Sequence, residues 1–247
     1  MDFTTVITFI KDMLLSVLTL LTMLSPTAGR AETFVAERPD DLITSFAVVS
    51  DIHVETNNPA SYDNFSDVLY GLKAGEDIDA VFYTGDNVMN GQVTEDILFY
   101  NALRFMKPAK YNFVVVGNHD VGNGEGDYEQ LRTKFLANNA LYLGNVITKD
   151  YYYRVINGCY MIVLSSEDDS ASGFNMTEEQ FTWLEGVLKK AQQEEARVFV
   201  FNHFPIRYLR SFEPQRLANL LNEYGCELFI HGHIHDHLGA DNFYTSY

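Results

Sequence analysis

The sequence predicts a single α/β domain with strands of mixed direction, and three observations predict it. Five short apolar runs, rich in β-branched and aromatic residues, have the length and composition of buried strands. Segments with helical periodicity separate several of these runs. Asn157-Gly158, which lies between two further apolar runs, is typical of a tight hairpin and so requires an antiparallel pair of strands. Alternating strands and helices indicate an α/β domain, and the hairpin makes its strand directions mixed.

The strands follow from composition, taken in chain order. The buried runs cover 45–50 (SFAVVS), 80–84 (AVFYT), 111–116 (YNFVVV), 197–201 (RVFVF) and 226–230 (CELFI), and the hairpin strands cover 151–156 and 159–165. Near-continuous apolar runs are expected where a strand is covered on both faces. These seven segments therefore predict sheets that are buried between other layers.

The helices follow from spacing and from their end signals. Apolar residues share one helical face in three segments, at Phe65, Val68, Leu69 and Leu72, then at Ile97, Leu98 and Leu103, then at Leu131, Phe135 and Leu136. Thr177 and Gln180 have the spacing of a capping box that begins a further helix. Pro214 suits the first turn of a last helix and Gly225 suits its end.

Residues 1–31 are expected to be a signal peptide ahead of a globular domain over residues 32–247. The apolar run 13–24 follows Lys11 and precedes a Gly29-Arg30-Ala31 cleavage site. That run is shorter than the roughly 20 residues that span a bilayer. The mature protein is therefore expected to be secreted or held in the cell envelope. An uncleaved membrane anchor over residues 13–24 and a packed N-terminal helix are the alternatives.

The charge balance excludes whole classes of partner. The chain carries 34 acidic and 17 basic side chains, for a formal net charge of −17. Binding to nucleic acid or to an anionic membrane surface needs a basic patch, which the sequence does not display. No nucleic-acid partner is expected, and no stable membrane contact beyond an N-terminal anchor. Two cysteines are too few for a disulfide framework, and whether Cys159 and Cys226 pair stays open.

Metal-binding residue types follow each of the five buried runs. They are Asp51 and His53, Asp86, Asn118 with His119 and Asp120, His203, and His233 with His235. Ligands of open α/β sheets bind at the carboxyl ends of strands, so these side chains are expected to converge. Oxygen and imidazole donors without thiolates suit Mn, Fe, Co, Ni or Zn.

Spacing and glycines support this convergence. Residues i and i+2 of an extended backbone project to the same side, which would explain the pairs Asp51/His53 and His233/His235. Gly85, Gly117 and Gly232 are expected to let the chain turn sharply where the strands end.

In this order the motifs resemble those of the calcineurin-like metallophosphoesterase family. The pattern of that family is D-x-H, then GD, then GNH followed by D or E, then a lone H, then GHxH. It appears here as Asp51-Ile52-His53, Gly85-Asp86, Gly117-Asn118-His119-Asp120, His203 and Gly232-His233-Ile234-His235. The resemblance implies a two-layer β-sandwich of mixed sheets flanked by helices. Within the family, the hairpin and the helix start at Gln180–Leu184 look most like the cyclic-nucleotide-phosphodiesterase branch.

The resemblance also implies a role for each motif residue. One divalent ion would be held by Asp51, His53, Asp86 and His235, and a second by Asp86, Asn118, His203 and His233. His119 would contact the phosphate or protonate the leaving group, and Asp120 would orient it. Two divalent ions at about 3.5–4 Å clamp an in-line displacement on phosphorus and make a metal-bound hydroxide available near neutral pH.

Two residues beside the motifs are candidates for substrate contact. Asn87 follows Asp86 and could bond to the substrate or to the groups around it, with a simple turn residue as the alternative. Arg207 follows His203 by four residues, and a guanidinium suits bidentate contact with phosphate. A solvated loop arginine is the alternative reading of Arg207.

The expected function is metal-dependent hydrolysis of small phosphodiesters or phosphomonoesters outside the cytoplasm. A nuclease of the same fold and a non-catalytic metal-binding module are the alternatives. The charge of −17 disfavours the first, and the presence of every ligand position disfavours the second. The chain ends twelve residues after His235, where the sequence predicts the beginning of another strand. Either the fold is truncated at its C-terminal sheet edge or the domain is unusually short.

Overall fold

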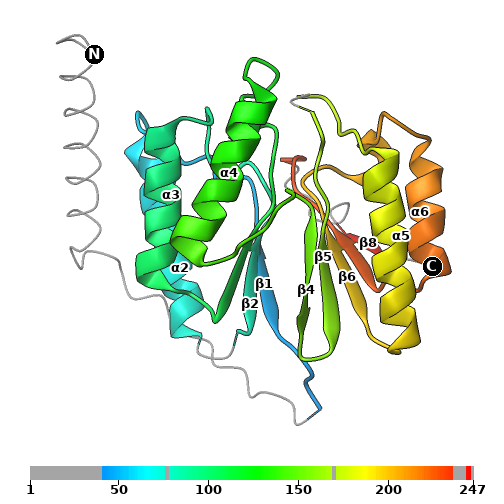
Figure 1. Cartoon of the computed structure of the whole chain (residues 1–247). Coiled ribbons are helices and arrows are strands. Elements are labelled where there is room, and N and C mark those ends of the chain that lie inside the picture. The colour runs from blue at the N-terminus through cyan, green and yellow to red at the C-terminus, as the bar shows by residue number, and fades with distance from the viewer. Residues whose placement is uncertain (1–40, 76–77, 169–170, 236–242, 246–247) are drawn as a thin grey trace.

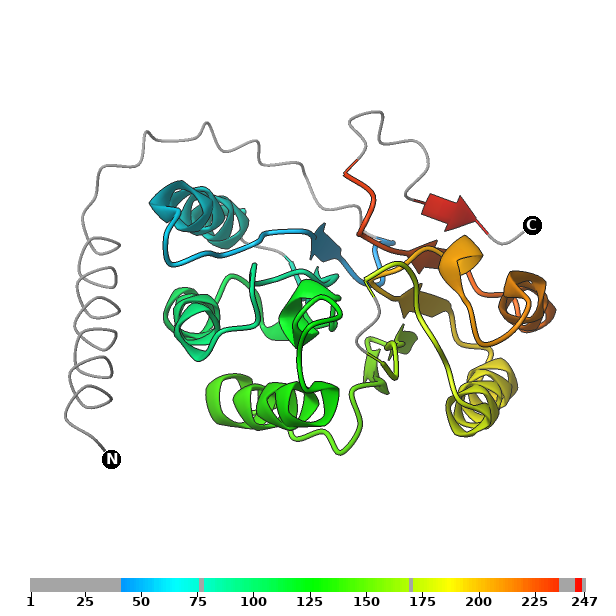
Figure 2. The ribbon, with the colours of Figure 1, turned by 90° about the horizontal axis from the view of Figure 1, so that it is seen from above.

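Two β-sheets pack against each other and helices cover their outer faces (Figures 1 and 2). The computed structural model describes residues 41–75, 78–168, 171–235 and 243–245. The first sheet has three parallel strands, β1 (Phe46–Val49), β2 (Ala80–Tyr83) and β3 (Tyr111–Val114). The second has the order β4 (Tyr152–Ile156), β5 (Cys159–Val163), β6 (Val198–Phe201), β7 (Leu228–Ile230) and β8 (Phe243–Thr245). Strands β5, β6 and β7 are parallel, while β4 and β8 are antiparallel to their neighbours.

The helices fall into two groups, one for each sheet. Helices α2 (Pro59–Ala74), α3 (Val93–Met106) and α4 (Tyr128–Leu143) lie on the side of the first sheet (Figure 2). Helices α5 (Glu178–Gln193) and α6 (Pro214–Glu223) lie on the side of the second. Two single turns of 3-10 helix, His119–Val121 and Ile206–Tyr208, sit in the loops that follow β3 and β6.

The interior between the sheets is aromatic. Phe82 of β2 and Phe201 of β6 stack face to face with ring centroids 3.7 Å apart. Phe46 of β1 meets both rings edge-on, at 5.8 and 5.6 Å. The next residue along β2, Tyr83, points to the other face and contacts Phe65 of α2. This alternation gives each sheet two buried faces, which explains why its strands are apolar throughout.

All seven expected strands are present, and the last apolar segment forms β8. Asn157 and Gly158 have φ of 50° and 80°, as a type I′ hairpin turn requires. The expected helices also form, although Val68 is 42% exposed and does not share the buried face of Phe65 and Leu69.

The expected capping box is only half formed. The Thr177 hydroxyl accepts from the Gln180 amide at 3.2 Å and caps α5. The Gln180 side chain does not bond back to Thr177. It accepts from the Ser165 amide at 3.2 Å and donates to the Ser165 carbonyl at 3.1 Å. Those buried backbone groups lie just beyond β5 and need partners, which outweighs the second half of the box.

Three sequence expectations concern the ends of the chain and its cysteines. The signal peptide proposed over residues 1–31 lies outside the described residues. Among the helices that are described, none combines the length and the apolar character needed to cross a membrane. Cys159 and Cys226 are both buried and both free thiols, so the open question of their pairing resolves to two unpaired cysteines.

Candidate metal centre

The loops that follow β1, β2, β3, β6 and β7 meet at one end of the two sheets. The loops after β1 and β2 are joined by a bond from the His53 amide to the Asp86 carbonyl at 2.9 Å. The loops after β6 and β7 are joined by a bond from the Gly232 amide to the His203 carbonyl at 3.0 Å. The His233 amide donates to both oxygens of Asp51 at 3.1 Å, which ties the second sheet to the first. The predicted convergence of strand ends is therefore confirmed.

The backbone that carries these side chains is left-handed at four points. The φ angles are 53° at Asp51, 50° at His53, 51° at Asp86 and 70° at His233. The extended backbone expected for the Asp-x-His and His-x-His pairs is therefore wrong. The strands end earlier, and each loop kinks so that its amides can bond to the neighbouring loop. Such φ values in non-glycine residues cost of order 1–3 kcal/mol each and cluster at functional sites.

The three glycines of the motifs act in two different ways. Gly85 has φ of 93°, and a Cβ there would lie 2.5 Å from Nδ1 of His203. Gly117 and Gly232 have no positive φ, so neither needs glycine for a left-handed backbone. A Cβ at Gly117 would overlap Asp86, and one at Gly232 would overlap Ser50 and Asp51. These two positions need glycine because the loops approach each other too closely for a side chain.

Asp51, His53 and His235 form one cluster of possible ligands. His235 Nε2 lies 3.2 Å from Asp51 Oδ1 and 3.3 Å from His53 Nε2. Asp86 Oδ2 lies 3.9 Å from His53 Nε2. This is the set that the resemblance assigns to the first ion, with Asp86 at its border.

A second cluster contains Asp86, Asn118, His203 and His233. His203 Nε2 lies 3.2 Å from Asp86 Oδ2, 3.0 Å from Asn118 Oδ1 and 3.3 Å from His233 Nδ1. His233 Nδ1 is also 3.1 Å from Asn118 Oδ1. Asp86 also forms a group of possible ligands with His53 and His119, so it lies between His53 of the first cluster and His203 of the second.

The donor chemistry of this second cluster fits a cation. Nδ1 of His203 donates to the Thr84 carbonyl at 2.9 Å, so Nε2 of the neutral ring carries a lone pair. That lone pair faces the carboxylate of Asp86 and the amide oxygen of Asn118. Acceptors this close repel one another unless a proton or a metal ion lies between them. Oxygen and imidazole donors suit a borderline divalent ion.

The pKa values of these side chains show the same demand for positive charge. Burial alone would lower the pKa of His203, but the Asp86 carboxylate outweighs it and raises that pKa to about 9. Burial would raise the pKa of Asp86, and His203 lowers it to about 2. Burial and the neighbouring His203 lower the pKa of His233 to about 4. One proton on His203 thus compensates the cluster when no metal is bound.

His119 lies beside the first cluster without being oriented as the sequence suggested. Its ring meets that of His53 edge-on, with centroids 4.7 Å apart. Nδ1 lies 2.7 Å from the Met89 carbonyl and, as the protonated nitrogen, donates to it. Nε2 is then the nitrogen that can exchange a proton with a substrate. The orienting partner is a backbone carbonyl, so the orienting role expected of Asp120 is wrong.

Asp120 is instead a buried junction between two loops. Its carboxylate accepts from the amides of Asn87, Val88 and Gly117 at 3.0, 3.1 and 2.8 Å, and from Asn87 Nδ2 at 3.0 Å. Burial and the nearby Asp86 charge raise the pKa of Asp120 to about 7, against the pull of these donors. Asp120 therefore fixes the loop after β2 to the loop after β3.

The two candidate substrate contacts lie in different surroundings. Asn87 is 2% exposed, and its Nδ2 also donates to the Val115 carbonyl at 3.0 Å. It belongs to the junction around Asp120. Arg207 is exposed, and its guanidinium lies 5.4 Å from the ring centroid of Tyr208. The Tyr208 ring is 5.6 Å from that of His233, so Arg207 lies near the rim of the second cluster.

Several contributors could not be found in the sequence. The carbonyls of Thr84 and Met89 orient two histidines, and backbone carbonyls have no sequence signature. The Ser50 hydroxyl donates to Asp51 Oδ2 at 2.5 Å. A cavity of about 640 Å³ adjoins the first cluster, and the first turns of α2 form one of its walls. Only the fold brings α2 to this place.

Comparison with known proteins agrees with this geometry. The family model of calcineurin-like phosphoesterases matches residues 44–237. No curated protein matches the chain. Among solved structures, the fold is similar to a dimetal phosphatase from Danio rerio, with a TM-score of 0.59 and 14% sequence identity. That similarity covers 79% of this chain and 82% of the other, and at this identity it concerns the fold.

Proposed function

The chain belongs to the calcineurin-like phosphoesterase family, and from this premise we propose that it hydrolyses small phosphomonoesters or phosphodiesters with uncharged leaving groups. As a member of that family it is a metal-dependent phosphoester hydrolase with a dinuclear divalent metal centre. The substrate class, the role of each residue and the location of the protein are proposals.

One observation carries the assignment of residues. Asp86 Oδ2 lies between His53 Nε2 of one cluster and His203 Nε2 of the other, at 3.9 and 3.2 Å. Its second oxygen accepts from the His119 amide at 2.9 Å, which fixes the carboxylate in this position. These contacts support the assignment of Asp51, His53, Asp86 and His235 to one ion, and of Asp86, Asn118, His203 and His233 to the other.

The protein contributes orientation and a proton to the reaction. When bound, two divalent ions lower the pKa of a water ligand and neutralise charge on the phosphoryl oxygens. Thr84 holds the His203 ring so that Nε2 faces the cluster, because Nδ1 is engaged. Met89 holds His119 with Nε2 available, and His119 would donate a proton to the leaving oxygen from that nitrogen.

The cavity beside the first cluster supports an uncharged leaving group. His53, His119 and His235 form its inner wall, and Asn58, Ser61, Asn64, Phe65 and Met89 are among the residues that line the remainder. Among the described residues, Glu55 is its only charged side chain apart from Asp51 and these histidines, and no Lys or Arg lines it. A leaving group that carried further phosphates would meet no counter-charge there. An alcohol with hydroxyl or apolar parts fits this lining.

Substitution of the shared carboxylate tests the function. Asp86→Ala should lose most of the bound metal and reduce turnover of aryl and alkyl phosphoesters at least about a hundredfold, because both ions lose a ligand. Asp63→Ala removes an exposed carboxylate of α2 and is the matched control. Metal content and kcat/KM are measured on the same preparations. Normal turnover with full metal content in Asp86→Ala would overturn the assignment.

The leaving-group proposal has its own test. Wild-type protein is given phenyl phosphate, a glycerophosphodiester, pyrophosphate and a nucleoside triphosphate at equal concentration. We expect the first two to have the higher kcat/KM, and we expect Glu55→Gln to improve the two charged substrates. Equal turnover of all four compounds would reject an uncharged leaving group while leaving the hydrolase itself intact.

We also propose that the enzyme works outside the cytoplasm, which rests on residues 1–31. The full chain is expressed in a secretion-competent host, and the recovered protein is sequenced from its N-terminus. Cleavage after Ala31 should give Glu32 as the first residue. Recovery of the chain in the cytoplasm with its first residues intact would reject export.

A further inference from the structure

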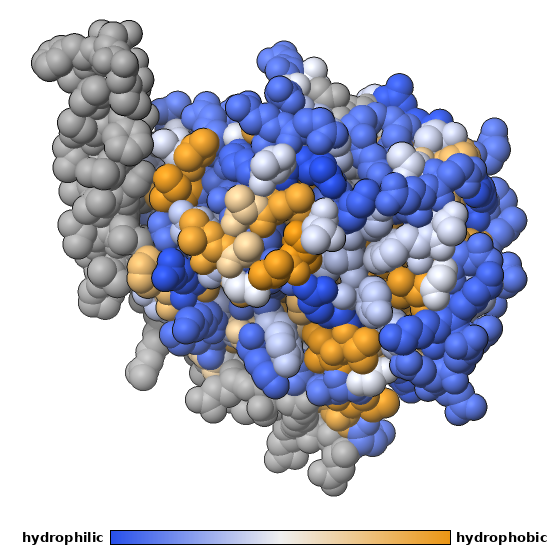
Figure 3. Space-filling view, viewed as in Figure 1, coloured by the Kyte–Doolittle hydropathy of each residue, from blue (hydrophilic) through white to orange (hydrophobic). Residues whose placement is uncertain are grey.

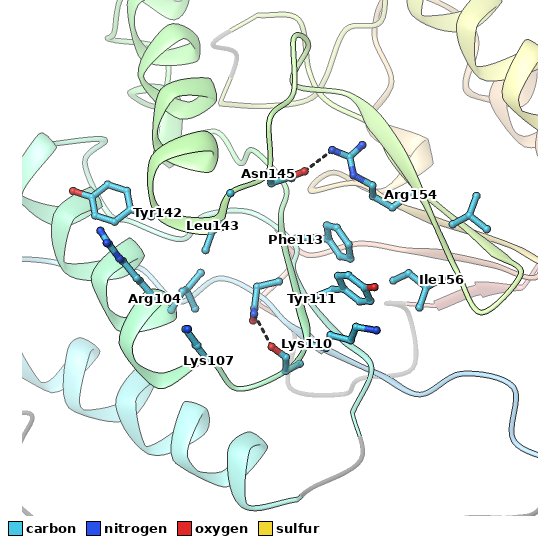
Figure 4. Close-up of a pocket in the computed structure, with 15 residues that line it drawn as sticks. Arg104, Lys107, Lys110, Tyr111, Phe113, Tyr142, Leu143, Asn145, Arg154 and Ile156 are labelled. Atoms are coloured by element: carbon cyan, nitrogen blue, oxygen red, sulfur yellow. Dashed lines mark hydrogen bonds between the residues drawn. The ribbon is translucent and has the colours of Figure 1, made fainter.

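A second cavity lies between the two sheets at the end away from the metal centre. Its volume is about 550 Å³, which is within the range of small-molecule sites. It is lined by residues 111–113 of β3, residues 154–156 of β4, the C-terminal turns of α3 and α4 and the loops after them (Figure 4). It shares no lining residue with the cavity beside His119.

The lining of this second cavity is basic. Arg104, Lys107, Lys110 and Arg154 surround it, and among the described residues no Asp or Glu lines it. Four of the 17 basic side chains of an acidic protein thus gather at one place. Figure 4 shows Arg104 and Lys107 on the α3 side and Arg154 on the β4 side, with Tyr111 and Phe113 between them.

Within the part of the chain that the structure describes, no ion pair neutralises these cations. Of the ion pairs between described residues, six hold the five cations Arg132, Lys134, Lys149, Lys189 and Arg216 against acidic side chains, and none holds a cation of this cavity. Arg154 is held in place by neutral acceptors, since it donates to Asn145 Oδ1 at 2.5 Å and to the Tyr153 carbonyl at 2.9 Å. Arg104, Lys107 and Lys110 are exposed. The cavity therefore concentrates positive charge in a protein whose net charge is −17.

The cavity also offers aromatic surface. The rings of Tyr111 and Phe113 stack with centroids 6.1 Å apart, and Tyr111 remains 39% exposed. Lys110 Nζ lies 4.9 Å from the centroid of Tyr111. Hydrophobic residues gather over α3 and α4 on the face shown in Figure 3, in agreement with the exposed Phe105 and Leu141 of those helices. A ligand here would meet cations and a flat apolar wall together.

We propose that this cavity binds a small anion that carries an aromatic ring, independently of the metal centre. The anionic group would lie against the guanidinium and ammonium groups, which form strong charge-assisted hydrogen bonds. The ring would lie against Tyr111, whose side chain is exposed and is backed by Phe113, and offset or edge-on stacking is favourable there. The inference stands apart from the hydrolase function, because it uses a different end of the sheets and different residues.

Binding of 4-fluorophenylphosphonate to the metal-loaded full chain, followed by fluorine NMR and equilibrium dialysis, tests the proposal. The test variant, Arg104→Gln/Lys110→Gln, removes two of the four positive charges of the cavity. Lys107 is kept, because it has the left-handed φ of 46° that ends α3. We expect Asp86→Ala to bind the phosphonate still at the second cavity. In Arg104→Gln/Lys110→Gln, the affinity of this cavity for the phosphonate should be weakened about tenfold or more. Inorganic phosphate supplies only the anionic group and neutral 4-fluorobenzamide only the aromatic ring. Both should bind to the second cavity more weakly than the phosphonate does.

Lys189→Gln/Lys190→Gln is the matched control, since it removes two positive charges from exposed α5 positions. It should bind the phosphonate as the wild type does, and thermal unfolding should show both double variants folded. Equal binding by the two double variants would overturn the proposal. So would loss of all phosphonate binding in folded Asp86→Ala, because the metal centre would then be the only site.

Discussion

Two histidines of the centre, His119 and His203, are oriented by backbone carbonyls. His203 and His119 each place Nδ1 against a carbonyl, of Thr84 at 2.9 Å and of Met89 at 2.7 Å. In each ring this leaves Nε2 for the chemistry. Side-chain substitution cannot delete a carbonyl, so the orientation depends on the loops that carry Thr84 and Met89. Tests at this scale must therefore address the histidine itself.

His119→Asn tests whether Nε2 protonates the leaving group. For an alkyl phosphoester, kcat should fall about 10²–10⁴-fold, because an amide cannot donate the proton as an imidazolium does. For a nitrophenyl ester, whose leaving group needs little protonation, the loss should be much smaller. Metal content should stay unchanged, as measured by elemental analysis. Equal losses for both esters would mean that His119 positions the phosphate and does not donate the proton.

Asp120→Asn tests the junction between the loops. The carboxylate accepts four N–H bonds, and an amide in its place would turn its own N–H₂ toward some of these donors. At a pH above 7, where the Asp120 carboxylate is charged, we expect the free energy of unfolding to drop by about 3 kcal/mol, since the buried donors lose a charged partner. Denaturant unfolding measures it, with Asp63→Asn as the exposed control. If the unfolding midpoint is unchanged and kcat no longer depends on the leaving group, Asp120 orients His119 after all.

At the scale of elements, the sequence predicted strands and helices well because their signals are local. Apolar runs such as 80–84 are buried on both faces, and composition alone reveals that. The loops after the strands were not predictable in the same way. Asp51 and His53 were expected on extended backbone, yet both are left-handed. That geometry arises from bonds to the loop after β2, more than thirty residues away, which no local spacing reports.

The candidate site shows the same division. The residue types and their order predicted that Asp86, His203 and the other proposed ligands would come together, because metal chemistry dictates the donors. The roles of the residues beside the proposed ligands were predicted less well. Asn87 and Asp120 were expected to act on substrate and on His119, and both are buried in a structural junction. Contacts across loops decide these roles, and they depend on the folded backbone.

Gly85→Ala tests the close approach of the loops after β2 and β6. The residue has φ of 93°, and the new Cβ would lie 2.5 Å from the His203 ring. We expect loss of about 2 kcal/mol or more of stability and a weaker second metal site, because His203 must move. Gly158→Ala is the control, with φ of 80° and open space around it. It should cost about 1 kcal/mol and leave metal affinity unchanged. Equal effects of the two variants on metal content would contradict the argument.

At the scale of the molecule, the proposed ligands come from both sheets. Asp51, His53, Asp86 and Asn118 follow strands of the first sheet, whereas His203, His233 and His235 follow strands of the second. Away from this end the sheets are held by the aromatic contact of Phe82 with Phe201. Metal ions at the centre would therefore connect the two sheets, and binding would be linked to the stability of the whole domain.

Removal of metal should lower the melting temperature of the entire domain. A ligand that binds only the folded state at a hundred times its Kd adds about 2.7 kcal/mol, which for a domain of this size corresponds to a shift of roughly 5–10 °C. Calorimetry of wild-type protein with Mn²⁺ and after chelation measures the shift. Asp86→Ala should melt at the same temperature in both conditions, which separates binding at the centre from nonspecific effects of the ion. If the wild type binds metal and its melting temperature does not change, the two sheets are not joined through the ions. The shift in melting temperature is large because the metal binds the folded state alone. In the unfolded chain the His and Asp side chains are far apart and cannot form a site that requires five separate loops to meet.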